Sequence, residues 1–166
     1  MILIAFCALT LLGHDLSIVA KLVPRIIIHS SIVKKSKVID IAIVHSRFNE
    51  HYAYKLKNKL ANDTYDFNWR INCLDIEKKN FSLDGYESVY VLDIEENDFG
   101  LLIKEVRENR VITFSDRLKY LDKGVMFAIK QNRKVSIHIN LDEADAMDIG
   151  FDPSALKYMK KYYAEK

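Results

Sequence analysis

A nearly continuous run of apolar, mostly β-branched residues from Val38 to His45 (VIDIAIVH) restricts the possible folds of this chain more than any other feature. Such a run predicts a strand that is buried on both faces, and strands of that kind occur mainly in parallel sheets covered by helices. A helical pattern follows over residues 50–61, where Ala53, Leu56 and Leu60 form an apolar face between lysines. A doubly buried strand followed by an amphipathic helix favours the α/β class.

The same alternation of patterns continues along the chain. Strands are predicted at 69–75, 88–93, 111–114, 124–130 and 134–140. Helices are predicted at 16–33 and 50–61, and a third helix begins at Asn97 or Asp98. A short helix then ends at Gly150, and the last helix begins at Asp152-Pro153. We therefore expect a single three-layer α/β domain with a mainly parallel sheet of about five or six strands and helices on both faces. The last two strands form a C-terminal antiparallel hairpin, with Gln131 and Asn132 as a two-residue turn.

Two helices carry specific expectations. Pro24 falls in the middle of the first helix and is expected to kink or split it, because proline has no backbone N–H to donate. The last helix is expected to bury a stripe formed by Leu156, Met159 and Tyr163.

Glycine and proline are scarce, with 5 Gly and 2 Pro in 166 residues, where average usage would give about 20 of the two together. Few chain breakers favour dense secondary structure with short connections. No two glycines have the spacing of a dinucleotide-binding or P-loop motif, so both of these phosphate-binding loops are excluded. The formal net charge of +2 is too close to neutral to predict nucleic-acid binding.

The uncharged segment from Met1 to Leu12 (MILIAFCALTLL) is shorter than the roughly 20 residues that a membrane-spanning helix needs. It fits the apolar region of a secretory signal peptide, so residues 1–13 are expected to be removed and residues 14–166 to form the domain. The alternative is a buried N-terminal strand or helix. After removal, Cys73 is the one remaining cysteine, which leaves no internal disulfide. Its role is either a small buried hydrophobe or a reactive thiol.

Catalytic patterns are absent from the sequence. The five histidines show no metal-ligand spacing, although His45 and His51 leave a weak metal alternative, and no nucleophile elbow is present. The acidic clusters at 93–98 and 141–148 sit at predicted helix starts, where the helix dipole favours negative charge. We therefore expect no enzyme activity, no cofactor and no metal site.

A receiver-like module is the main competing interpretation. Asp93 ends the third predicted strand, where a phospho-accepting domain keeps its aspartate, and Thr113 or Ser115 and Lys130 end the next two strands. The magnesium-binding acids that should follow the first strand are replaced by His45-Ser46-Arg47.

The C-terminal half carries one further pattern. A strand ends in Thr113-Phe114-Ser115-Asp116, Gly124 precedes an apolar strand over 125–129, and Arg133 lies in a short basic turn. An alternating strand then ends in Ile139-Asn140-Leu141, followed by Gly150 and the segment Ser154–Met159. In these features, over residues 111–163, the chain resembles the YfiR-like family of periplasmic proteins, and the remainder agrees in element order.

This resemblance implies an α/β fold and export to the periplasm of a Gram-negative bacterium, often as a homodimer. It also implies a non-enzymatic regulator that binds and inhibits the periplasmic sensor region of a membrane-anchored diguanylate cyclase, in cyclic di-GMP signalling. No nucleic-acid partner and no transmembrane segment in the mature chain are expected. The alternative is a cytoplasmic, degenerate receiver-like or small-ligand-binding α/β module.

The residues matched to the family are the candidates for ligand or partner binding: Thr113, Ser115, Asp116, Arg133 and Asn140. Each also has a structural interpretation. Thr113, Ser115 and Asp116 either cap a loop or line a small-ligand cleft at the strand ends, and Asn140 is a candidate helix N-cap. The tyrosines at 158, 162 and 163 form a partner surface unless helical packing buries them.

Overall fold

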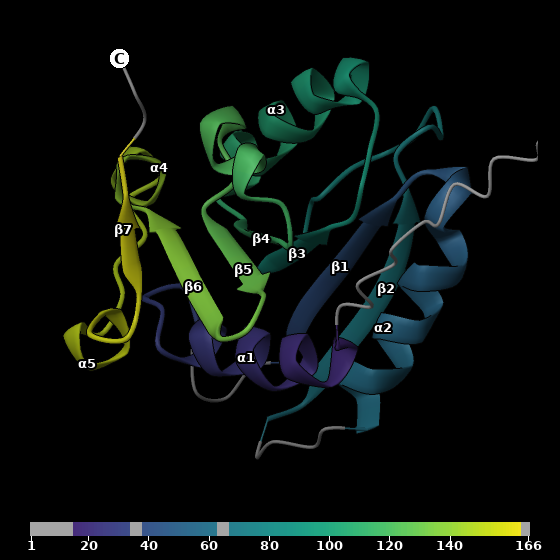
Figure 1. Cartoon of the computed structure of the whole chain (residues 1–166). Coiled ribbons are helices and arrows are strands. Elements are labelled where there is room, and N and C mark those ends of the chain that lie inside the picture. The colour runs from purple at the N-terminus through teal and green to yellow at the C-terminus, as the bar shows by residue number, and fades with distance from the viewer. Residues whose placement is uncertain (1–14, 34–37, 63–66, 164–166) are drawn as a thin grey trace, which may run out of the picture.

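The computed structural model describes residues 15–33, 38–62 and 67–163, which build one seven-stranded sheet with the order β2-β1-β3-β4-β5-β6-β7 (Figure 1). The predicted signal peptide, residues 1–13, lies outside the described residues. The strands are β1 (Ile39–His45), β2 (Trp69–Asp75), β3 (Ser88–Val91), β4 (Ile112–Ser115), β5 (Phe127–Gln131), β6 (Val135–Asn140) and β7 (Lys160–Tyr162).

The α-helices are α1 (Leu16–Ile28), α2 (Glu50–Asn62), α3 (Phe99–Asn109), α4 (Leu141–Ala146) and α5 (Pro153–Leu156). Three 3-10 turns accompany them: η1 (Arg47–Asn49), η2 (Glu96–Asp98) and η3 (Leu118–Lys123). Within the described ranges, no helix has both the length and the apolar character needed to span a bilayer.

The sheet is parallel except between β5 and β6, which confirms the predicted α/β class and the antiparallel hairpin. From β1 the chain moves outward to β2 through α2, and from β3 it moves the opposite way to β4 through α3. Right-handed crossovers in opposite directions place α2 and α3 on opposite faces of the sheet. Helix α1 packs beside α2, so these two helices cover one face while α3 lies on the other (Figure 1).

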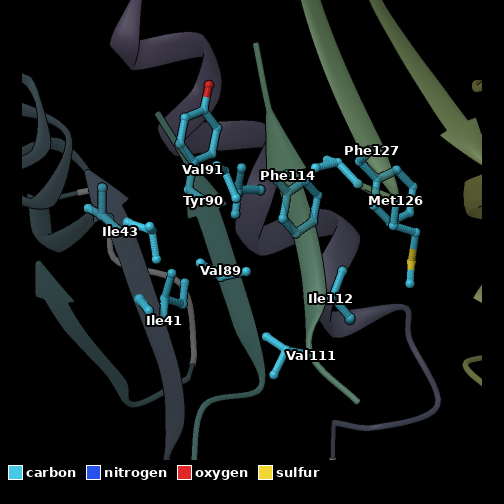
Figure 2. Packing of buried hydrophobic residues seen from close by; sticks show 14 of the residues in the cluster. Ile41, Ile43, Val89, Tyr90, Val91, Val111, Ile112, Phe114, Met126 and Phe127 are labelled. Carbon is cyan, nitrogen blue, oxygen red and sulfur yellow. The ribbon is translucent and has the colours of Figure 1, made fainter. Parts of the chain in front are cut away.

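The core lies between these layers and is built mainly from the central strands. All seven residues of β1 and all four residues of β3 and of β4 are buried. Figure 2 shows the rings of Phe114 and Phe127 side by side on neighbouring strands, and their centroids are 5.0 Å apart in a stacked arrangement. Phe151 meets Phe127 edge-on at 5.1 Å, so the segment before α5 also closes the core.

The first helix differs from its prediction. Helix α1 is not split at Pro24 but runs through it as one element, and it ends earlier than predicted, at Ile28. Pro24 itself is buried, as are Val19, Val23 and Ile27 on the same helix. Packing of this apolar stripe against the sheet and α2 offsets the hydrogen bond that proline cannot donate.

The C-terminus differs more strongly from its prediction, because the expected final helix is mostly absent. Asp152 caps a helix of only four residues, and residues 160–162 form β7 parallel to β6. Tyr163, predicted to be buried, is 69% exposed. The seventh strand arises because β6 offers unpaired backbone groups along its outer side, which the residues after α5 satisfy. The hairpin turn is also longer than predicted, since residues 132–134 connect β5 to β6.

Substitution of Phe114 tests this description of the core. Phe114→Ala removes a fully buried ring and is expected to lower the free energy of unfolding by about 3–5 kcal/mol. Phe48→Ala is the matched control, because Phe48 is 90% exposed and its loss is expected to change stability by no more than about 0.5 kcal/mol. Chemical denaturation of both variants measures the difference, and equal effects would contradict the assigned core.

Candidate functional site

Strand β2 lies on one side of β1, whereas β3 and the later strands lie on the other side. The direction in which the chain adds strands to the sheet therefore reverses beside β1. In open α/β sheets, ligands bind outside the carboxyl ends of the strands at such a reversal. Polar side chains from the end of β4 and from the segments that follow β1, β3 and β4 meet there, and we call this set the strand-end cluster. Its members are Ser46, Asn49, Asp93, Ser115, Arg117 and Tyr120.

Asp93 is the centre of the strand-end cluster. Its carboxylate accepts a hydrogen bond from the Tyr120 hydroxyl at 2.7 Å and a charge-assisted one from the Arg117 guanidinium at 3.1 Å. Its backbone carbonyl accepts from the Asn49 amide and, at 3.5 Å, from the Ser46 hydroxyl. One residue therefore joins the loops that leave three neighbouring strands.

Tyr120 is held in place on several sides. Its hydroxyl donates to Asp93 and also accepts a hydrogen bond from the backbone N–H of Ile94 at 3.3 Å. Its ring packs edge-on against Phe99 with a centroid distance of 4.4 Å. Burial, together with the hydrogen bond to Asp93, raises the pKa of Tyr120 far above its usual value, so the phenol stays neutral and remains a donor.

Thr113 and Ser115, which the sequence marks as candidates, use their hydroxyls within the sheet. The Thr113 hydroxyl oxygen accepts from the backbone N–H of Met126 at 2.6 Å. The Ser115 hydroxyl donates to the carbonyl of Val91 at 2.9 Å and accepts from the N–H of Arg117 at 3.2 Å. Both side chains are buried, and these bonds join β4 to β3, to the residue that precedes β5 and to the following turn.

The other three candidates lie in different places. The Asp116 carboxylate is 3.5 Å from the Arg117 guanidinium, so Asp116 borders the strand-end cluster. Asn140 is buried and caps α4, accepting from Glu143 N–H at 3.3 Å and donating to the Leu121 carbonyl at 3.0 Å. Arg133 is exposed in the β5–β6 turn and lines a separate groove. The structure therefore brings Ser115 and Asp116 together and leaves Arg133 and Asn140 apart from them.

Four members of the strand-end cluster were missed in the sequence: Ser46, Asn49, Arg117 and Tyr120. A usable signal exists for Ser46, which directly follows a predicted buried strand. Arg117 and Tyr120 come after Ser115 in a stretch that could be a loop or a short helix, and only the 3-10 geometry of η3 turns Tyr120 toward Asp93.

The strand-end cluster contains no nucleophile paired with a base. Its charged groups neutralise one another, yet the side chains of Arg117 and Asp93 are 44% and 54% exposed, so both remain accessible to a bound molecule. His45 is buried with its Nδ1 atom 3.0 Å from the Ser46 carbonyl. In the part of the chain that the structure describes, no three His, Cys, Asp or Glu side chains are grouped as a metal site. Cys73 is half-buried, and burial raises the pKa of its thiol.

Comparison with known proteins gives one family and several solved structures with a similar fold, among them the following two. A family model described as YfiR/HmsC-like matches residues 17–158. A crystal structure of a conserved domain protein from Vibrio cholerae O1 biovar El Tor superposes with a TM-score of 0.62 at 11% identity, covering 89% of this chain and 60% of that one. The ABC domain in complex with L-Trp from Streptococcus pneumonia gives a TM-score of 0.53 at 9% identity, with coverages of 75% and 55%. No curated protein matches the sequence.

At these identities the two solved structures show a shared fold and nothing finer. This chain also spans 60% or less of the length of either protein. The family match, by contrast, extends over nearly all described residues and includes both the strand-end cluster and the C-terminal hairpin.

Removal of one hydroxyl tests the role of Tyr120. Tyr120→Phe deletes the donor to Asp93 and leaves the buried N–H of Ile94 without its acceptor, so the free energy of unfolding is expected to fall by about 1–3 kcal/mol. Tyr158→Phe is the control, because Tyr158 is 78% exposed and no such loss is expected there. Thermal and chemical unfolding measure the stability of both variants. If Tyr120→Phe is as stable as the unaltered protein, the proposed stabilising role of the hydroxyl is wrong.

Proposed function

The chain belongs to the YfiR/HmsC-like family, and on that basis we propose that it is a periplasmic regulator that binds the sensor region of a membrane-anchored diguanylate cyclase and keeps the cyclase inactive. The observation that carries this proposal is the family match over residues 17–158. Members of this family are regulators in cyclic di-GMP signalling. The inhibitory direction, the cyclase partner and a homodimeric state are the finer parts of the proposal.

The geometry of the strand-end cluster supports a binding protein over an enzyme. Asp93 uses its carboxylate and its carbonyl to fasten loops, and the hydroxyls of Ser115 and Tyr120 are engaged in the same network. A catalytic group needs a pKa matched to proton transfer, whereas the Tyr120 pKa is displaced away from neutrality. The non-enzymatic part of the proposal rests on these assignments.

A surface for the protein partner is suggested by Phe48. This ring is 90% exposed in η1, directly after β1, on a turn that Ser46 and Asn49 fasten through a hydrogen bond of 3.0 Å. Tyr54, 50% exposed, follows in the second turn of α2. Aromatic side chains on rigid elements are the usual anchors of protein interfaces, because they bury a large area at little entropic cost.

Phe48→Ser tests both the partner and this surface. We expect the variant to bind the isolated sensor region of the cyclase at least about tenfold more weakly, and cells carrying it to contain more cyclic di-GMP. Leu101→Ser is the matched control, since Leu101 is also exposed but lies on α3, on the opposite face of the sheet from α2. Calorimetric titration and a cyclic di-GMP assay are the measurements. Absence of binding by the unaltered protein would contradict the cyclase as partner.

Export is tested separately. Alkaline phosphatase fused after residue 20, with any upstream codons included, is expected to be active, because this enzyme requires the oxidising periplasm. An inactive fusion that remains in the cytoplasm would contradict the periplasmic location.

Sedimentation of the purified chain tests the homodimer, and a monomer at all concentrations would contradict the proposed homodimeric state.

A second candidate function is binding of a small ligand, which the direction reversal beside β1 favours. One of the similar folds was solved in complex with L-Trp. A ligand at this place would contact the exposed atoms of Arg117 and Asp93, so Arg117→Ala is expected to weaken its binding. Native mass spectrometry of the protein purified from the periplasm detects a retained small molecule, and none would be found if the protein partner alone occupies this surface.

A further inference from the structure

A second hollow of the surface, distinct from the strand-end cluster, lies over the hairpin and the last strand. This groove has a volume of about 700 Å³. Four cations line it, and the polar groups between them include a hydroxyl and an imidazole: Lys130, Arg133, Lys134, Lys160, Ser136 and His138. We call this set the basic groove.

Strand register explains why these residues meet. Lys130 lies opposite Ser136 across the β5–β6 pair, and Lys160 lies opposite His138 across the β6–β7 pair. Because alternate residues of a strand point to the same face, Ser136 and His138 share one face of β6, and their partners project from that face too. Arg133 and Lys134 come from the turn that joins β5 to β6. Strand β7 adds Lys160 to a groove whose other lining residues come from β5, β6 and the turn between them.

The charges of the basic groove are not balanced. Among the described residues, no Asp or Glu lines it, and none of its four cations forms an ion pair. Other basic side chains of the chain are paired, such as Arg70 with Asp40 and Arg107 with Glu143. The fold therefore brings four cations without a carboxylate partner into one groove, although the whole chain has a formal net charge of only +2.

The pKa of His138 reflects the positive charge around it. Partial burial, reinforced by the nearby Lys160 and Lys130, lowers the pKa of His138 below its usual value. Its Nε2 atom lies 3.1 Å from the Ser136 hydroxyl oxygen, so the ring and the hydroxyl form a hydrogen-bonding pair between the lysines. Like charges that oppose protonation of an imidazole stabilise an anion at the same place.

We propose that the basic groove binds a small soluble anion that carries phosphate groups. Lysine and arginine side chains are the common phosphate ligands, and the Ser136 hydroxyl adds a neutral donor. Four cations line the groove, which is more positive charge than a single phosphate neutralises, so a ligand with two linked phosphates matches it better. The hollow shape favours a discrete molecule over a lipid surface, which is flat. This site is additional to the proposed regulatory function and does not depend on it.

The test uses inorganic pyrophosphate as the probe and the full chain as the protein. Calorimetric titration at low ionic strength is expected to show binding that weakens as salt is added. The double variant Lys130→Gln, Lys160→Gln is expected to bind at least about tenfold more weakly, because two of four cations are lost while a polar side chain of similar size remains. Amide NMR shifts on titration are expected to centre on Ser136 and His138.

The double variant Lys78→Gln, Lys79→Gln is the matched control. It removes the same charge from the exposed loop after β2, at the other end of the sheet order, and is expected to bind pyrophosphate as the unaltered protein does. Circular dichroism establishes that all variants are folded. The proposal is overturned if pyrophosphate does not bind, if both double variants lose binding equally, or if the NMR shifts map elsewhere. It is also overturned if phosphatidylglycerol vesicles bind in place of pyrophosphate, because the site would then recognise a membrane surface.

Discussion

Burial of β1 on both faces is the constraint on which the rest of the structure depends. All seven of its residues are buried, including Asp40 and His45, so the strand requires a neighbour on each side and a helical layer above and below. Asp40 is tolerated there because Arg70, on the adjacent strand, forms an ion pair with it and Glu87 binds its backbone N–H at 2.8 Å. The reversal of strand order beside β1, and with it the strand-end cluster, follows from this central position.

Elements that depend on the local sequence pattern could be predicted. Elements whose conformation depends on contacts with distant segments could not. Strand β2 has the predicted bounds, because Trp69, Ile71 and Cys73 alternate with polar residues at the spacing of a strand. Residues 153–163 carry apolar side chains at helical spacing, yet they form only one turn of helix, since the open side of β6 recruits Lys160–Tyr162. Pro24 is accepted inside α1 because the packing of its neighbours outweighs its missing donor. The pairing of Tyr120 with Asp93 is equally invisible to local patterns, because it links residues 27 apart.

Two polar regions of this molecule contrast in how their charges are used. In the strand-end cluster, acceptors and donors satisfy one another, which gives a rigid platform that presents the exposed ring of Phe48. In the basic groove, the cations have no carboxylate beside them among the described residues. A saturated platform suits recognition of a protein surface by shape, while an uncompensated groove suits capture of a charged ligand. The two regions use different segments of the sheet, so one molecule has room for both.

The position of β1 also sets an order for the assembly of the chain. Among the described residues β1 is the first strand in the chain, but it lies inside the sheet, with β2 on one side and β3 on the other. Until residues 88–91 arrive, one side of its backbone has no partner, and its apolar side chains lack the covering that α3 and β4 later provide. Nonlocal pairing of this kind slows folding and leaves an aggregation-prone segment accessible in the meantime. In a chain built in this way, β1 stays unpaired on one side throughout the interval between its own emergence and that of β3.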